Sequence, residues 1–290
     1  MKLNLLDFTE LKSFPSGSGI EFYDDKIYLV GDDAKDILVT NRKWKELQRI
    51  NLFESKEERI AKKIKADLEA TAILHLDKMV YLLIMGSGSK ALRNSCILLN
   101  VETGDKTELD CSVFYQRLQS MGIIDLNIEG AAEVSDYMLF CNRGNKTNPA
   151  NQLIITSIDF FRHQQDAPVR ILDIDLSEYE GTMALSGACY SYEHDWLLFT
   201  ASTEDTGNSY EDGHIGKSYL GIIEDAYRKI TKDRIKVNDL IDLSATNKKF
   251  DGYKIESVCI QSERKYSMKL HLAADNDNGE SYLFKVRLRF

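Results

Sequence analysis

A short signature of one polar residue beside small residues recurs five times along the chain. Each copy is followed by a dense apolar run that ends in small, polar or acidic residues. Runs of this length are typical of buried β-strands. The five signatures are Ser18-Gly19-Ile20, Leu68-Glu69-Ala70, Ile128-Glu129-Gly130, Ser186-Gly187-Ala188 and Ile255-Glu256-Ser257. The five apolar runs are residues 27–30, 79–85, 137–141, 196–201 and 268–274.

The spacing of the signatures predicts repeated units of four strands. Their positions, 19, 69, 129, 187 and 256, are separated by 50, 60, 58 and 69 residues. The second and third runs of a unit are apolar on successive residues, so both faces of each sheet are covered. Small sheets repeated around a centre describe an all-β fold, the β-propeller. The fourth runs include residues 45–53, 169–176 and 235–243.

The two ends of the chain carry complementary parts of one repeat. The fifth repeat ends at Phe290 after three strands, whereas residues 1–11 precede the first signature as an orphan strand. We therefore predict one domain over residues 1–290, a five-bladed β-propeller. Its N-terminal strand completes the last blade and removes the open edges of the ring. Six blades is the alternative, if one repeat has lost its signature.

Two stretches between repeats depart from the strand pattern. Residues 54–65 are polar, with charges at three-to-four spacing, and residues 113–119 have a short amphipathic pattern. We expect both to form helical turns that connect blades at the surface.

Charge and composition narrow the choice of partners and compartment. The 290 residues include 37 basic and 46 acidic ones, which leaves a formal charge of −9. This charge provides no basis for sequence-independent binding to nucleic acid or to an anionic membrane. Five cysteines without a close pair predict buried, reduced thiols. Because residues 1–10 include Asp7 and Glu10, we expect no signal peptide and a cytoplasmic protein.

Propeller topology brings two sets of polar residues to one face of the ring. The start of each innermost strand carries Glu69, Glu129 or Glu256 in three repeats, and Ser18 or Ser186 in the other two. The loop between the second and third strands emerges on the same face. The loop residues expected there are Asp32, Asp33, Ser87, Ser89, Arg93, Asn142, Arg143, Asn145, Lys146, Glu204, Asp205, His214, Lys217, Asp275 and Asp277.

Glu69, Glu129 and Glu256 are the candidate metal ligands. Carboxylates around one channel mouth repel one another unless a cation or an arginine offsets them. Calcium accepts six to eight oxygens at flexible geometry, which suits such a ring, whereas magnesium needs a stricter octahedron. Calcium or another divalent cation is therefore one hypothesis. The alternative is that each glutamate accepts hydrogen bonds from backbone amides of the next blade and fixes blade packing.

Two loops offer further ligand contacts. Gly86-Ser87-Gly88-Ser89 matches neither a Walker loop nor a nucleophile elbow, but its backbone amides could hold an anion near Lys90 and Arg93. The charged loop of residues 202–217 contains Glu204 and His214. It is either a lid over the site or a solvated insertion.

The order of these motifs is similar to that of the esterase-like phytase propellers, which carry serine-glycine-leucine, glutamate-glycine and serine-aspartate-asparagine signatures. The stretches that carry the resemblance are Ser18-Gly19-Ile20, Asp67-Leu68-Glu69, Asn127-Ile128-Glu129, Ser186-Gly187-Ala188, Lys254-Ile255-Glu256 and Ala274-Asp275-Asn276. Glu69 and Glu256 depart from the pattern, because alanine and serine follow them where glycine is usual. A closer resemblance is to uncharacterised bacterial propeller proteins with similar loops.

The phytase-like resemblance implies metal-assisted hydrolysis of a phosphate or other ester. It implies that the three glutamates hold the cation and that Asp33 or Asp275 orients water. Phosphate oxygens would be neutralised by Arg93, Arg143, Lys90 and Lys146. The other candidate contacts for an anionic or phosphorylated small molecule are Ser87, Ser89, Asn142, Glu204 and His214. The competing hypothesis is a non-catalytic propeller whose top face binds a small ligand or another protein.

Overall fold

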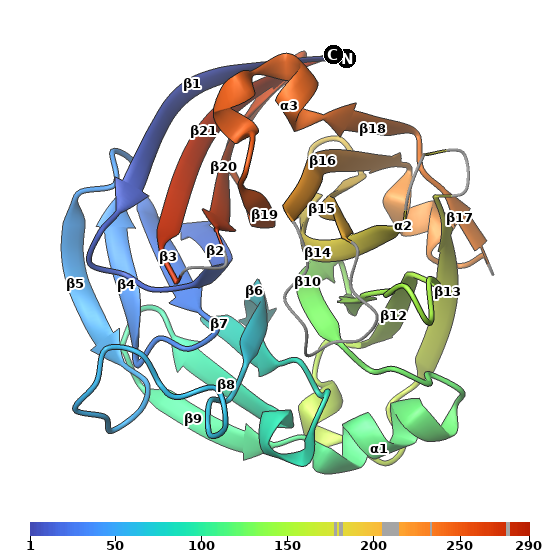
Figure 1. Ribbon diagram of the computed structural model, residues 1–290. Helices are drawn as coiled ribbons and strands as arrows, with labels where there is room; N and C mark the ends of the chain where they lie inside the picture. The colour runs from blue at the N-terminus through green and yellow to red at the C-terminus, as the bar shows by residue number, and fades with distance from the viewer. Residues whose placement is uncertain (177–178, 180–181, 205–214, 233, 277–278) are drawn as a thin grey trace.

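Five small sheets are arranged in a ring around a common centre in the computed structural model (Figure 1). The structure describes residues 1–290 except 177–178, 180–181, 205–214, 233 and 277–278. The predicted all-β, five-bladed propeller is confirmed, and the alternative of six blades is excluded. Within the described residues, no helix is long and apolar enough to cross a membrane.

In every blade three or four strands that are consecutive in sequence run outward from the innermost strand, and in blades 3, 4 and 5 a strand from elsewhere in the chain is added at the outer edge. Blade 1 contains β2 (Gly17–Tyr23), β3 (Lys26–Gly31), β4 (Asp36–Asn41) and β5 (Glu46–Asn51). Blade 2 contains β6 (Leu68–Leu76), β7 (Met79–Gly86), β8 (Ser95–Asn100) and β9 (Lys106–Asp110). Blade 3 contains β10 (Ile128–Val134), β11 (Tyr137–Asn142), β12 (Gln152–Ser157), β13 (Val169–Asp175) and β17 (Arg234–Lys236). Blade 4 contains β14 (Met183–Ser191), β15 (Trp196–Glu204), β16 (Ile215–Glu224) and β18 (Asp239–Asp242).

Blade 5 joins the two ends of the chain, as the sequence predicts. It contains β19 (Lys254–Arg264), β20 (Ser267–Asp275), β21 (Ser281–Arg289) and, as its outer strand, β1 (Lys2–Leu11). β1 pairs antiparallel with β21 from Lys2 opposite Arg289 to Leu11 opposite Ser281. The N-terminal strand therefore covers the edge that β21 would otherwise expose.

The apolar pattern of residues 235–243 predicts one fourth strand. That prediction is wrong. The run is divided between two blades: β17 adds to β13 as a parallel fifth strand of blade 3, and β18 completes blade 4. Ile235 and Val237 are buried where these two blades pack together, which accounts for the apolar pattern.

The connectors differ from each other. Residues 54–65 form no helix, so that expectation is wrong: the segment lies along blade 1, where Ala34 bridges to Arg59 and the Ile60 amide donates to the Asp33 carbonyl. Residues 113–119 do form a helix, α1 (Ser112–Ser120). The remaining short helices are α2 (Ala226–Lys229), α3 (Leu243–Thr246), and the 3-10 turns η1 (Ala91–Arg93), η2 (Phe160–Arg162) and η3 (Lys248–Phe250).

A β-bulge interrupts every innermost strand at the signature. The strand register shifts between Gly17 and Gly19, Leu68 and Ala70, Ile128 and Gly130, Leu185 and Ala188, and Ile255 and Ser257. A bulge leaves its extra residue outside the ladder and re-aims its side chain. The residues at these bulges include the five polar signature residues, Ser18, Glu69, Glu129, Ser186 and Glu256.

Apolar side chains of neighbouring blades fill the space between the sheets. Between blades 2 and 3, for example, Phe114 of α1 lies 4.7 Å from Phe160 and 6.2 Å from Phe140, measured between ring centroids. All five cysteines are free and buried. One apolar cluster thus lies between each pair of neighbouring blades around the ring.

Two leucines of β1 test the ring closure. Leu3 is 6% exposed and packs into the core of blade 5, whereas Leu6 is 43% exposed. Leu3→Ala should lower the free energy of unfolding by about 2–4 kcal/mol, because it leaves a cavity under the closing strand. Leu6→Ala should change it by less than about 0.5 kcal/mol. Equal effects in urea unfolding would show that β1 does not hold the ring closed.

Candidate functional site

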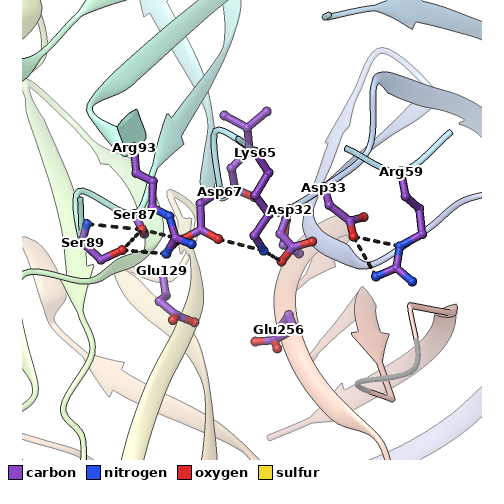
Figure 2. Close-up of polar contacts among 12 residues, drawn as sticks. Asp32, Asp33, Arg59, Lys65, Asp67, Ser87, Ser89, Arg93, Glu129 and Glu256 are labelled. Carbon is purple, nitrogen blue, oxygen red and sulfur yellow. Dashed lines mark hydrogen bonds and ion pairs between the residues drawn. The ribbon is translucent and has the colours of Figure 1, made fainter. Parts of the chain in front are cut away.

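Polar residues from the bulges and from the loops after the second strands lie close together near the centre of the ring (Figure 2). Arg143, from the loop after β11, contacts bulged Glu129 of β10. Asp32, from the loop after β3, lies close to bulged Glu69 of β6. We call this group of residues the channel mouth: it comprises Asp32, Lys65, Asp67, Glu69, Arg93, Glu129, Arg143, Lys254 and Glu256. Described members of the two sequence-distant sets therefore lie close together there.

A buried ion-pair network links blades 1 and 2 at the channel mouth. Lys65 Nζ contacts Asp32 and lies 2.8 Å from Asp67 Oδ1. Arg93 Nη1 lies 2.6 Å from Asp67 Oδ2, and the Ser87 hydroxyl donates to the same oxygen at 2.6 Å. Arg93 also donates to Ser89 Oγ at 2.8 Å. Figure 2 shows these side chains in one continuous line of contacts.

A second group of charges lies on blades 3 and 5. Glu129 accepts from Arg143 at 2.8 Å and from the Asn127 side chain at 2.7 Å. Glu256 Oε1 lies 2.8 Å from Lys254 Nζ, while Glu256 Oε2 is buried without a hydrogen-bond partner within the described residues. The observed partners of both glutamates are side chains of their own blades, rather than backbone amides of the next blade.

Burial raises the pKa of three carboxyl groups at the channel mouth. Loss of water raises the pKa of Glu69 well above the ordinary 4.5, and the nearby charges of Asp67 and Glu129 add to this rise. Burial raises the pKa of Glu256 to about 8, despite the attraction of Lys254. Burial also raises the pKa of Asp32 to about 6. Such shifted groups are characteristic of functional sites, where several titratable residues share a cleft.

The most compact set of possible metal ligands comprises Asp32, Asp67 and Glu69. One ligand oxygen from each lies within 4.8 Å of the others. Of the three glutamates expected to share a cation, this set includes only Glu69, so the three-glutamate site stays a prediction. The Lys65 ammonium already contacts Asp32 and Asp67, and it occupies the position that a cation would take between them.

The other predicted site residues are placed as follows. Asp33 pairs with Arg59 at 2.8 Å, and Asn142 is buried, accepting from the Asn127 amide at 2.8 Å. Asp275 is half-buried at the end of β20, where its charge contributes to the raised pKa of Glu256. Lys90 and Lys146 are exposed. Glu204 ends β15, and His214 lies outside the described residues, as do Asp205 and Asp277.

Sequence reasoning missed Lys65, Asp67, Asn127 and Lys254 as members of the site. Three of them share a signal: Asp67, Asn127 and Lys254 each stand two residues before a bulged glutamate. Asp67 also adopts a positive φ of 55°, a conformation that is uncommon outside glycine. Lys65 carries no comparable signal, because its segment matches a solvated connector in composition.

The raised pKa of Glu256 predicts how stability changes with pH. Because the folded state binds the proton more tightly than the unfolded state, the free energy of unfolding should fall as pH rises from about 5 to about 8. Glu256→Gln mimics the protonated group and keeps an oxygen for Lys254. It should raise stability at pH 8.5 by about 2 kcal/mol and have little effect at pH 5. Glu108→Gln, at an exposed position, is the control.

Urea unfolding at pH 5 and pH 8.5 measures the free energy of unfolding of the native chain, Glu256→Gln and Glu108→Gln. A stabilising effect of Glu256→Gln that is the same at pH 5 and pH 8.5 would contradict the assigned pKa.

Solved structures with a similar fold cover nearly the whole chain. Glutaminyl cyclase from Myxococcus xanthus superposes with a TM-score of 0.58 at 9% identity, over 99% of this chain and 96% of that one. A member of the DUF4221 family from Bacteroides vulgatus has a TM-score of 0.45 at 10% identity, over 100% and 99% of the two chains. At such identities the cyclase shows the likeness of fold alone. No curated protein matches the sequence.

A match to a sequence family also covers nearly the whole chain. Residues 13–288 match the model of the "Family of unknown function (DUF6929)". The match covers all five signatures. The chain is therefore a member of the DUF6929 family, with the fold of a β-propeller.

Proposed function

We propose that the channel mouth binds a small anionic or phosphorylated molecule and hydrolyses a phosphate or other ester in it. The observation that carries this proposal is the state of Glu256, whose carboxyl group is buried at the channel mouth with one oxygen unpaired. A buried carboxyl oxygen without a hydrogen-bond partner lowers the stability of the folded chain. Packing between the blades does not require such a group. The resemblance to esterase-like phytase propellers supports the choice of reaction.

Glu256 and Asp32 have the properties of an acid and a base at neutral pH. With a pKa of about 8, Glu256 is mostly protonated at pH 7 and can donate its proton to a leaving oxygen. With a pKa of about 6, Asp32 is mostly ionised and can accept a proton from water. Environments that separate the pKa values of two carboxyl groups in this way are a mark of acid–base pairs. Arg93 and Arg143 supply positive charge for the oxygens of a phosphate or carboxylate.

A divalent cation belongs to this proposal at Asp32, Asp67 and Glu69. Their three oxygens fit a hard cation such as calcium, which binds carboxylates at flexible geometry. A cation bound there would polarise an ester or phosphoryl oxygen. Lys65 must leave the two aspartates before the cation binds, so the lysine and the metal compete for one position.

An assay for hydrolysis tests the proposed reaction. Phosphomonoesters and carboxylic esters are incubated with the full chain and with calcium, magnesium or manganese. Glu256→Gln should lower kcat at least about 100-fold, because it removes the general acid. Glu263 lies at the other end of β19, where it accepts a hydrogen bond from the Ser191 hydroxyl. Glu263→Gln is therefore the control and should leave kcat unchanged.

Two results would contradict the proposed reaction. One is absence of turnover with every substrate and metal tested. The other is equal loss of activity in the Glu256→Gln and Glu263→Gln variants, which would place the activity elsewhere or indicate a contaminant. The first result would favour a propeller that binds its ligand without reacting.

Substitution of Lys65 tests the competition with a cation. Lys65→Met leaves three carboxylates without their central ammonium, so calcium should raise its melting temperature by about 3–5 °C and by less in the native chain. Lys63→Met removes an exposed lysine of the same segment and is the matched control. A calcium response in Lys65→Met no larger than in the control would exclude this cation position.

A further inference from the structure

A segment with an excess of positive charge lies at the outer edge of blades 3 and 4. Residues 228–236 contain five basic residues and one acidic residue, in a chain whose formal charge is −9. The segment runs from the last residues of α2 to the end of β17, which is the outermost strand of blade 3 (Figure 1). It therefore lies away from the channel mouth and takes no part in the reaction proposed there.

This segment borders a cavity of about 450 Å³, which we call the basic cavity. Its lining residues are Lys229, Lys232, Ile235, Lys236, Val237 and Asn238. Sites for small molecules have volumes of about 300–1,000 Å³, whereas one water takes up about 30 Å³. The basic cavity therefore has room for a small organic molecule. Three lysines among six lining residues favour a ligand with negative charge.

The backbone around the basic cavity is held in place by blade 3. Ile235 and Val237 are buried in the apolar cluster between blades 3 and 4. β17 pairs in parallel with β13. Arg170 of β13 donates to the Thr231 carbonyl at 2.6 Å and to the Lys232 carbonyl at 3.3 Å. The turn that carries the lysines and the strand that follows it are thus both attached to β13.

Lys229 is positioned by Asn238. Its Nζ donates to Asn238 Oδ1 at 2.6 Å, and the Glu224 backbone amide donates to the same oxygen at 2.9 Å. The Asn238 backbone amide in turn donates to the Ile222 carbonyl at 2.9 Å. Lys229 has no other hydrogen-bond partner among the described residues. Because an ammonium group has three protons, two of them remain for a ligand.

The ammonium group of Lys229 lacks a paired negative charge. Neither Lys229 nor Lys232 forms an ion pair with a described residue, and the nearby Asp225 carboxylate lies 2.6 Å from Arg228. Burial lowers the pKa of Lys229 more than the charges of Asp225 and Glu224 raise it, and Lys232 and Arg228 lower it further. An anion between Lys229 and Lys232 would stabilise both ammonium groups.

We propose that the basic cavity binds a phosphorylated small molecule. Lys229 and Lys232 donate to oxygens of its phosphate group, since lysine binds phosphate as a point charge. The organic part of the ligand packs on the two buried apolar residues that line the cavity. Lys236 stands opposite Asp175 in the strand ladder, so recognition of the phosphate is assigned to the other two lysines.

Calorimetric titration with phenylphosphonate tests the basic cavity in the full chain. The phosphorus of this probe is bonded to carbon, so it is not hydrolysed as an ester. Lys229→Met should weaken binding about tenfold, the effect of one lost hydrogen bond to a charged group. Lys232→Met should weaken it about threefold, because this side chain is exposed and solvent screens its charge. Lys248→Met removes the same charge at an exposed position of η3 and should leave the affinity unchanged.

Inorganic phosphate and an acidic peptide complete the test. Phenylphosphonate should bind more tightly than inorganic phosphate, because only phenylphosphonate covers apolar surface. The reverse order would overturn the place assigned to the organic part. A peptide of six glutamates represents the competing ligand, an acidic segment of a protein partner. Binding of the peptide but of neither phosphorus compound would overturn the proposal. Equal affinity for phenylphosphonate in Lys229→Met and Lys248→Met would overturn it as well.

Discussion

The close approach of five innermost strands around one channel is the constraint on which the rest of this structure depends. The innermost strands belong to five separate sheets and are not paired with one another by backbone hydrogen bonds. Neighbouring blades therefore touch through packed side chains and through close backbone approaches. The residue that faces the neighbouring blade must then be small: a Cβ at Gly19 would lie 2.4 Å from the Thr71 methyl, and one at Gly187 would lie 2.5 Å from the Ser257 Cα. At Glu69, Glu129 and Glu256 the bulge beside the small residue brings a carboxyl group to the channel mouth, whereas the Ser18 hydroxyl donates to the Leu68 carbonyl. The small residue of each signature therefore permits close packing of the blades, and three of the signatures also place a glutamate at the channel mouth.

This geometry concentrates carboxyl groups where water is scarce, and the chain responds in two ways. Some carboxylates receive a cation from their own blade or from the preceding segment, as Asp67 does from Lys65 and Arg93. In others burial raises the pKa, as at Glu69 and Glu256. The channel mouth thus combines fixed cations with carboxyl groups that burial makes harder to ionise.

The fold could be predicted because its constraints are local and repeated. Recurring apolar runs identified the blades, and the three-strand fifth repeat together with the orphan strand of residues 1–11 identified the closing strand. The charged partners could not be predicted in the same way. Lys65 comes from residues 54–65, whose spacing of charges is the same for a solvated helix and for a segment that folds against acidic loops. Residues 235–243 show the same limit, since an apolar pattern reports burial but not which sheet is joined.

We expect burial at the channel mouth to keep Glu256 protonated at neutral pH. Carbon-13 NMR of protein labelled at the glutamate side-chain carboxyl carbons measures this directly during a titration from pH 4 to pH 10. We expect one resonance to titrate near pH 8 and to vanish in Glu256→Gln. If the resonance assigned to Glu256 titrates near its ordinary value of about 4.5, the carboxyl is solvated and the account of the channel mouth is wrong.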